Sequence, residues 1–254
     1  MSLKLYAKEF IKRILASRGY IITNAQANRA RMDCALQGIK DRNYPIRSII
    51  DVGASDGRWS SDAMHHLKDC QYFLIEAQPV HTNALEQFCK ACNNSQYVIA
   101  AAGDRPGQIY FDASHPMLGQ ASYTPFLHNN IIVPVTTIDL EIEKHQLPGP
   151  YLIKMDTHGF EVPILKGAEI VLTQTEVLII ECYNFKIAPD SLLFYEMCNY
   201  LGSLGFRCID LVDPRHRVRD GVFWQADLVF VKADSPEFKD PTFDGSFGGT
   251  CQEG

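Results

Sequence analysis

From residue 48 onward, the chain alternates short, almost wholly apolar runs with segments of helical periodicity. Runs that are apolar on both faces and alternate with helices are typical of a parallel sheet covered by helices on both sides. The pattern therefore predicts a doubly wound α/β fold. The predicted strands are residues 48–52, 72–77, 97–102, 151–156 and 177–182, and the predicted helices lie near residues 59–67, 79–92, 161–174 and 190–204.

The C-terminal part of the pattern differs from the rest. Residues 208–212 (CIDLV) and 226–231 (ADLVFV) are two further apolar runs, and the polar connection between them has no helical segment. Consecutive strands without a crossover helix pair antiparallel. We therefore expect a mostly parallel, seven-stranded sheet that ends in an antiparallel C-terminal hairpin.

Three regions follow from this pattern. Residues 1–47 are predicted to form an N-terminal helical extension, 48–232 the α/β domain, and 233–254, which is rich in proline and glycine, a flexible C-terminal tail. Residues 1–20 place apolar side chains at helical spacing and carry five basic residues against one acidic residue, a net charge of +4. That segment suits an anionic surface, and equally packing on the domain itself or on a dimer mate.

Composition narrows the class of protein. With 24 Lys and Arg against 30 Asp and Glu, the formal net charge is −6, which argues against nucleic-acid binding through a basic surface. No apolar run reaches the ~20 residues of a transmembrane helix, and charged residues interrupt the segment where a signal peptide would lie. The eight cysteines are scattered, unlike those of a secreted disulfide scaffold. We therefore expect a cytoplasmic protein.

The first predicted strand ends in a turn that contains glycine, IIDVGASDG at residues 49–57. In doubly wound sheets, ligands bind beyond the C-terminal ends of the strands, where the strand order reverses. Gly53 and Gly57 allow a tight turn and a close approach of backbone amides to a ligand. A dinucleotide fingerprint needs glycines where this chain has Ser55 and Arg58. A pyrophosphate site is therefore disfavoured, and with it a nicotinamide-dependent dehydrogenase.

Acidic side chains near this turn indicate a different ligand. Carboxylates at the strand end and in the turn suit a cation or an ammonium group better than a phosphate. Glu76 ends the second predicted strand, where an acid can accept both hydroxyls of a ribose. S-adenosylmethionine is a nucleoside with a cationic, amino-acid-like end and no phosphate, and it satisfies these constraints. The expected cofactor contacts are Asp51, Gly53, Ala54, Asp56, Gly57 and Glu76.

Several segments carry a family resemblance that extends from about residue 31 to about residue 232. They are IIDVGASDGRWSSDA, YFLIEAQP, VIAAAGD, VTTIDL, VLIIECYN and, most specific of all, the K-x-D-x-x-G-x-E-x-x-x-L-K-G-A run at 154–168. Together they resemble the FkbM family of S-adenosylmethionine-dependent methyltransferases. The resemblance implies a Rossmann-like methyltransferase sheet and O-methylation of a sugar, a polyketide or a related hydroxylated metabolite. It also implies cofactor roles for Gly53, Asp56, Gly57 and Glu76, and an active-site role for Asp156.

The chemistry of methyl transfer draws attention to Asp156 and His158. The acceptor must be aligned with the methyl group, and its proton must be weakened or removed. Side chains alternate along a strand, so the two residues project to the same side if the extended geometry continues past the fourth parallel strand. An imidazole can accept a proton at neutral pH. Many FkbM relatives have Glu or Gln at the position of His158, and a loop histidine bonded to backbone is the alternative for this residue. Asp156 is expected to hold the imidazole, contact the ammonium group of the cofactor or bind a divalent cation.

Glu181 ends the fifth predicted strand at an equivalent position, and Tyr183 follows on the same side. Together with Asp156 they would form a set of hard oxygen ligands suited to Mg²⁺, or else a polar rim of the active site. Glu181 is therefore a third candidate catalytic residue beside Asp156 and His158.

Two segments are candidates for binding the methyl acceptor. The connection at 213–224 follows a strand that we expect to be parallel, so it should lie on the cofactor side of the sheet. Its Arg215, Arg217 and Trp224, together with Tyr183, are the expected contacts for a phosphate, a carboxylate or a sugar face. A solvated hairpin tip is the alternative. The irregular segment at 112–130 is expected to act as a lid.

The sequence thus favours an S-adenosylmethionine-dependent O-methyltransferase with a small-molecule or glycan acceptor. An N-methyltransferase and a methyltransferase-fold binding protein without catalytic activity remain as alternatives. The sequence also leaves open whether the chain forms a homo-oligomer.

Overall fold

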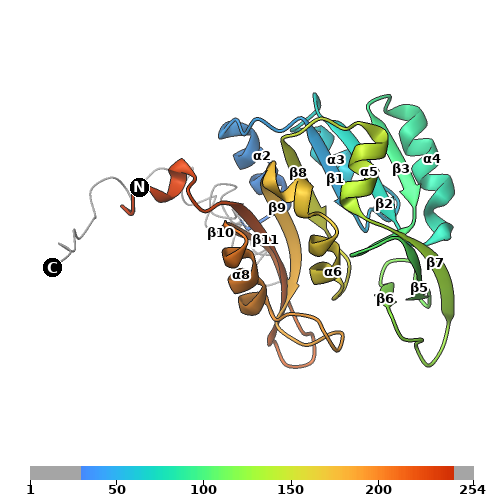
Figure 1. Ribbon diagram of the computed structural model, residues 1–254. Helices are drawn as coiled ribbons and strands as arrows, with labels where there is room; N and C mark the ends of the chain where they lie inside the picture. The colour runs from blue at the N-terminus through green and yellow to red at the C-terminus, as the bar shows by residue number, and fades with distance from the viewer. Residues whose placement is uncertain (1–29, 243–254) are drawn as a thin grey trace, which may run out of the picture.

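The computed structural model describes residues 30–242, and its centre is a seven-stranded sheet with the order β10-β11-β9-β8-β1-β2-β3 (Figure 1). β11 runs antiparallel to β9 and β10, and the other neighbours are parallel. This confirms the predicted doubly wound, mostly parallel sheet with a C-terminal hairpin. The strands are β1 (Ser48–Val52), β2 (Gln71–Glu76), β3 (Ser95–Ile99), β8 (Tyr151–Met155), β9 (Thr175–Tyr183), β10 (Phe206–His216) and β11 (Phe223–Lys232).

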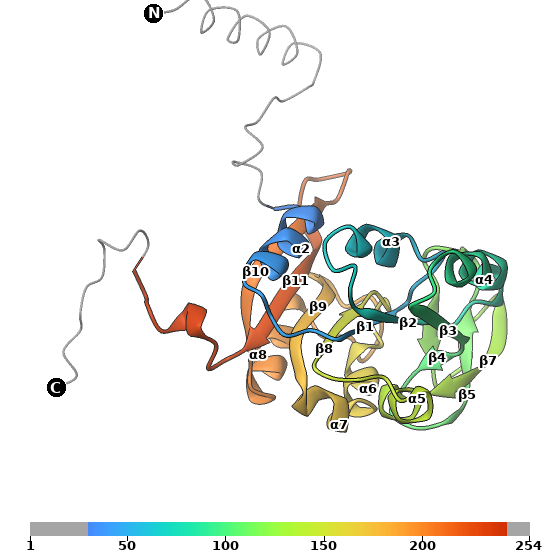
Figure 2. The ribbon, with the colours of Figure 1, turned by 90° about the horizontal axis from the view of Figure 1, so that it is seen from above.

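Helices cover both faces of this sheet, as Figure 2 shows. Neighbouring strand residues point to opposite faces, so Ile49 and Leu152 lie in one apolar cluster while Ile50 and Ile153 lie in the other. Burial of both faces explains why the strands read as unbroken apolar runs. One face carries α2 (Met32–Asp41), α3 (Arg58–Met64) and α4 (Thr82–Ala91), and the other α5 (Ile138–His145), α6 (Glu161–Lys166), α7 (Glu169–Thr173) and α8 (Phe194–Ser203).

A second sheet of four strands, with the order β4-β7-β5-β6, differs from the prediction. The strand predicted at 97–102 is divided between the two sheets, and the segment predicted to be irregular at 112–130 contains β6 and the ends of β5 and β7. Two of these strands, β4 and β6, are very short, and Pro134 lies within β7, so the strand pattern of this region is weak. Their bounds are β4 (Ala101–Ala102), β5 (Gly107–Asp112), β6 (Gln120–Ser122) and β7 (Asn130–Thr136).

The segment before β1 contacts the segment after β11. The Tyr44 hydroxyl donates a hydrogen bond to the Glu237 carboxylate at 2.7 Å, next to the short helix η3 (Pro236–Phe238). The first residues of the predicted tail thus contact the segment between α2 and β1. The predicted amphipathic helix at 1–20 lies outside the described residues. No helix within 30–242 combines the length and apolar character needed to cross a membrane.

Candidate active site

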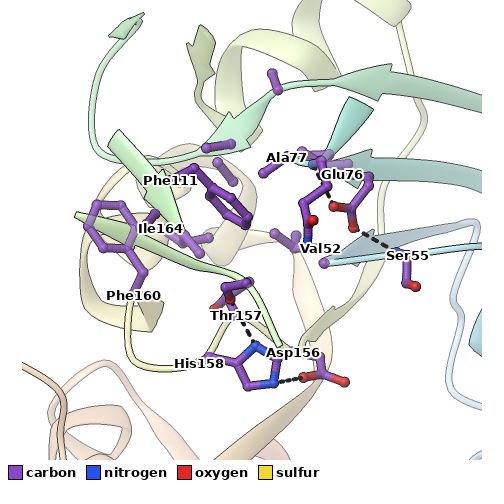
Figure 3. Close-up of a pocket in the computed structure, with 18 of the residues that line it drawn as sticks. Val52, Ser55, Glu76, Ala77, Phe111, Asp156, Thr157, His158, Phe160 and Ile164 are labelled. Atoms are coloured by element: carbon purple, nitrogen blue, oxygen red, sulfur yellow. Dashed lines mark hydrogen bonds and ion pairs between the residues drawn. The ribbon is translucent and has the colours of Figure 1, made fainter. Parts of the chain in front are cut away.

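A pocket of about 620 Å³ opens between the two sheets, at the C-terminal ends of β1, β2 and β8 (Figure 3). In the sheet, β2 lies on one side of β1 and β8 on the other, so the strand order reverses at β1. A doubly wound sheet binds its ligand at such a reversal. The large sheet contributes polar groups to the wall and the small sheet contributes apolar ones. The polar side includes Glu76, Asp156 and His158, and the apolar side includes Ala101, Ala102, Phe111 and Ala121.

The turn after β1 is built so that its backbone lies against the end of β8. Gly53 has a φ of +76°, and a Cβ atom there would lie 2.1 Å from the carbonyl oxygen of Asp156. Only glycine fits this junction. The Gly53 amide donates to the Ile75 carbonyl at 2.9 Å, which fixes the turn to β2 as well. The turn therefore holds the ends of three strands together at the pocket.

Glu76 is buried at the end of β2, with its carboxylate held by backbone amides. The Ser55 amide donates to Oε2 and the Gln78 amide to Oε1, both at 2.7 Å. Burial raises the pKa of Glu76, and these two amides act in the opposite direction. Each oxygen retains a second lone pair, so the carboxylate can still accept hydrogen bonds from a ligand in the pocket.

A buried lysine connects the turn after β1 to the end of β8. Asp51 and Lys154 are register partners in adjacent strands, and the Lys154 Nζ lies 3.5 Å from Asp51 Oδ1 and 3.5 Å from Asp156 Oδ2. Burial raises the pKa of Asp51. Burial has the same effect on Asp156, but Lys154, His158 and a hydrogen bond with Glu181 together outweigh it, and the pKa of Asp156 is lowered. Sequence reasoning missed Lys154, although two opposite charges in neighbouring apolar strands were a usable signal.

His158 reaches the site through a turn. β8 ends at Met155, and His158 has a left-handed backbone with a φ of +51°, so the extended geometry does not continue to His158. Its Nδ1 lies 3.1 Å from the Gly119 carbonyl oxygen. Because a carbonyl can only accept a hydrogen bond, Nδ1 carries a proton, and in the neutral imidazole Nε2 then carries the lone pair. Nε2 lies 3.5 Å from Asp156 Oδ1 and 3.6 Å from Glu181 Oε2.

Glu181 is buried and accepts hydrogen bonds from the Tyr183 hydroxyl and the Gln225 side-chain amide. Burial, and then the charge of Asp156, raise the pKa of Glu181 to about 9. The Tyr183 oxygen is therefore engaged with Glu181, and the third group beside the two carboxylates is the imidazole of His158. The cluster therefore consists of Asp156, Glu181 and His158, and the Tyr183 oxygen expected in the Mg²⁺ set is not part of it.

The candidate acceptor residues form a row that leads away from His158. The Tyr183 ring centroid lies 6.3 Å from that of His158, and Trp224 meets Tyr183 edge-on at 5.7 Å. Phe185 stacks on Trp224 at 5.0 Å, and the Arg217 guanidinium lies 4.4 Å from the centroid of Phe185. Three of the four expected acceptor residues therefore lie together. The fourth, Arg215, is exposed on β10, opposite Gln225.

The remaining expected cofactor residues do not line the pocket. Asp51 and Ala54 are buried beneath the turn, and Gly57 has a φ of +83° at the start of α3. Asp56 turns to the Arg58 guanidinium, with which it forms an ion pair at 2.6 Å. These residues therefore support the conformation of the turn and do not face the pocket.

The loop between β5 and β6 closes one side of the pocket, in agreement with the expected lid position. The Gln78 side-chain amide donates to the Pro116 carbonyl at 3.0 Å, and the His81 Nε2 lies 2.8 Å from the same oxygen. Pro116 and Met117 line the pocket. Sequence reasoning missed Gln78 and His81, whose only signal was their position just after the ribose-binding acid predicted at Glu76.

Comparison with known proteins places the chain in a family. The model of the methyltransferase FkbM domain matches residues 51–208. Methyltransferase FkbM from Methylobacillus flagellatus KT is 20% identical with a TM-score of 0.48; the match covers 73% of this chain but only 43% of that one. No curated protein matches the chain.

Two further solved structures are similar to this chain. The fibrillarin pre-rRNA processing protein of Methanococcus jannaschii is 16% identical, with 81% of this chain and 76% of that chain covered and a TM-score of 0.47. Aeropyrum pernix fibrillarin, solved with natively bound S-adenosyl-L-methionine, is 13% identical, with 79% and 76% covered and a TM-score of 0.44. Because the family model matches more than half of this chain, the chain belongs to the FkbM methyltransferase domain family.

Proposed function

We propose that the protein transfers the methyl group of S-adenosylmethionine to a hydroxyl group of a sugar, a polyketide or a related small metabolite. Methyltransferase activity follows from the family, and S-adenosylmethionine is the typical cofactor of this fold. The observation that carries the finer proposal is the arrangement of one pocket. Glu76 lies on one side of it, and Asp156 and His158 lie on the other (Figure 3).

The cofactor would lie across the ends of β1 and β2. Glu76 would accept the ribose hydroxyls, and the small apolar side chains of β4 together with Phe111 and Ile164 would hold the adenine ring. The sulfonium and its methyl group would then point toward Asp156. The carboxylate near that position favours a cationic group, since the charge of a sulfonium is attracted to it in a partly dry site.

Activation of the acceptor would fall to Asp156, His158 and Glu181. In an in-line displacement the acceptor oxygen must face the methyl group, and its O–H bond must be weakened. The lone pair on His158 Nε2 is directed to the space between the two carboxyl groups, which the hydroxyl would enter. The loop from Ala113 to Gly119 would exclude water from this space.

The row of aromatic side chains supports an acceptor of the size of a sugar ring or larger. Trp224 and Phe185 present a stacked pair beside Tyr183, and aromatic faces are suited to the apolar face of a sugar. Arg217, beside Phe185, would then contact a phosphate or carboxylate on the same acceptor.

Methyl transfer from labelled S-adenosylmethionine to a panel of hydroxylated and amino compounds tests this proposal. We expect an O-methylated product. Trp224→Ala should raise the KM for the acceptor about 10-fold or more, because a half-buried aromatic contact is lost, while the KM for the cofactor stays unchanged. Tyr195→Ala, which removes an aromatic ring that is 55% exposed elsewhere, is the matched control. An N-methylated product, or equal KM values in the two variants, would contradict the proposal.

A further inference from the structure

The side chains at the ends of β8 and β9 converge on a single point. Asp156, His158 and Glu181 each offer one ligand atom, and these atoms all lie within 4.8 Å of one another. We propose that they bind a divalent first-row metal cation of the zinc type, and that the acceptor hydroxyl occupies an open position on it. The role of the cation in methyl transfer rests on the proposed function, whereas binding of the cation does not depend on it.

The two distances from His158 Nε2 fit a shared cation better than direct hydrogen bonds. Nε2 of His158 lies 3.5 Å from Asp156 Oδ1 and 3.6 Å from Glu181 Oε2. A hydrogen bond between such atoms would be about 2.7 to 3.0 Å long. Zinc ligands lie about 2.0 to 2.2 Å from the metal, which in tetrahedral geometry separates one ligand from the next by about 3.4 Å. The observed distances match that value.

Each proposed ligand is held by a second group, as metal ligands usually are. His158 donates its Nδ1 proton to the Gly119 carbonyl, which leaves Nε2 free for a metal. The Tyr183 hydroxyl and the Gln225 amide fix the two oxygens of Glu181. Asp156 directs Oδ2 at the Lys154 ammonium. These contacts orient one lone pair of each ligand toward the common point.

A further observation indicates an absent positive charge. Oδ1 of Asp156 is buried and has no hydrogen-bond partner among the described residues. The Lys154 ammonium lies 3.5 Å from Oδ2 of Asp156 and 3.5 Å from Oδ1 of Asp51, so it is shared between two carboxylates. A buried charge needs a partner. A divalent cation at the common point would supply one for Oδ1 of Asp156.

The donor set selects the type of metal. Mg²⁺ requires oxygen ligands, whereas two carboxylates and one imidazole suit Zn²⁺ and similar ions. Three protein ligands leave a fourth position open, as in catalytic zinc sites. There the cation would lower the pKa of the acceptor hydroxyl, which releases its proton to solvent. The oxygen then forms a bond to the methyl carbon, the carbon–sulfur bond breaks, and its electron pair returns to sulfur to give S-adenosylhomocysteine and the methyl ether.

Titration of metal-stripped protein with Co²⁺ alone, followed by visible absorption and equilibrium dialysis, tests the site. We expect one Co²⁺ per chain. Asp156→Asn and Glu181→Gln should each weaken binding at least 10-fold, and Tyr183→Phe, which keeps all three ligands, by a smaller factor. His66→Gln is the matched control, because His66 forms a surface ion pair with Asp33 at 2.9 Å. Circular dichroism verifies that each variant is folded.

If the wild type binds no Co²⁺, or binds it with the same affinity as the Asp156→Asn variant, the metal site is refuted. Calorimetry with S-adenosylhomocysteine on the same protein separates this result from a failure of the proposed function. Binding of S-adenosylhomocysteine without Co²⁺ would overturn only the metal site. Binding of Co²⁺ without S-adenosylhomocysteine would support the metal site and overturn the proposed function.

Discussion

Lys154 joins the turn after β1 to the candidate catalytic residues. Its ammonium lies at 3.5 Å from a carboxylate oxygen of Asp51 and of Asp156, and it faces the Trp59 ring at 5.7 Å from the centroid. Removing one member of such a buried group leaves uncompensated charge, whereas removing two opposite members together costs less. Lys154 therefore determines both the stability of the strand pair β1–β8 and the position of Asp156.

Substitution of Lys154 should reveal this dependence. Lys154→Met leaves Asp51 and Asp156 without their cation, and we expect the free energy of unfolding to fall by about 3 kcal/mol or more. Because Asp51 is then neutral, the double variant Asp51→Asn, Lys154→Met should recover part of the loss. Urea denaturation of the three proteins measures both effects. If the double variant has a lower free energy of unfolding than Lys154→Met, the two losses add and the pairing of Asp51 with Lys154 is disproved.

The raised pKa of Glu181 makes stability depend on pH. The pKa of this carboxyl is about 9 in the folded protein, because of burial and the charge of Asp156, against ~4.3 for an ordinary Glu in an unfolded chain. Between these two pH values, Glu181 is protonated in the folded state and ionised in the unfolded state. The stabilisation from this protonation is full below about pH 4 and is lost as the pH rises toward 9. We expect metal-free wild type to be less stable at pH 8.5 than at pH 6, and Glu181→Gln to lose much of this difference. Urea midpoints at the two pH values decide it, and an unchanged difference in the variant would contradict the assignment.

At the scale of elements, the sequence predicted the strands that form apolar runs. It did not predict the small sheet or the turn at His158, which depends on contacts between distant residues. The strands of the large sheet were predictable from their apolar runs, which are buried on both faces in β1 and β9 and partly exposed in the edge strands β3 and β10. The small sheet was not, since β4 has two residues and β6 has three. Glu76 and Asp156 were predictable as acids at strand ends. The turn that brings His158 back to Asp156 is set by tertiary contacts to Gly119, which no local pattern encodes.

The junction between the turn after β1 and the end of β8 should not tolerate a side chain. In Gly53→Ala the new Cβ atom would clash with the Asp156 carbonyl, and a φ of +76° adds strain. We expect a loss of about 2 to 4 kcal/mol in the free energy of unfolding, together with weaker binding of S-adenosylhomocysteine. Gly107→Ala, where a Cβ atom would meet nothing within 4 Å, is the control. Equal stability of the two variants in thermal denaturation would refute the close approach.

The loop between β5 and β6 should affect ligand binding more than stability. Gln78→Ala removes the hydrogen bonds from its side-chain amide to the His115 and Pro116 carbonyls at the edge of the pocket. We expect the affinity for S-adenosylhomocysteine to fall about 5- to 30-fold, because the loop is no longer held closed, with little change in melting temperature. Gln37→Ala, on exposed α2, should bind normally in the same calorimetric titration. An unaltered affinity in Gln78→Ala would show that the loop does not contribute.

At the scale of the whole molecule, the pocket depends on two sheets that meet at one edge. The large sheet supplies charged groups at the ends of β2 and β8, and the small sheet supplies an apolar wall (Figures 1 and 3). A charged nucleoside with a flat apolar base needs both surfaces. The division of residues 97–102 between the sheets is thus what creates the binding pocket.

A crystal structure of the protein with S-adenosylhomocysteine tests this arrangement most directly. We expect the ribose hydroxyls at the Glu76 carboxylate, the adenine against Phe111, and the sulfur facing the space between Asp156, His158 and Glu181. An adenosyl group bound elsewhere, or a sulfur directed away from these three side chains, would contradict the central claim.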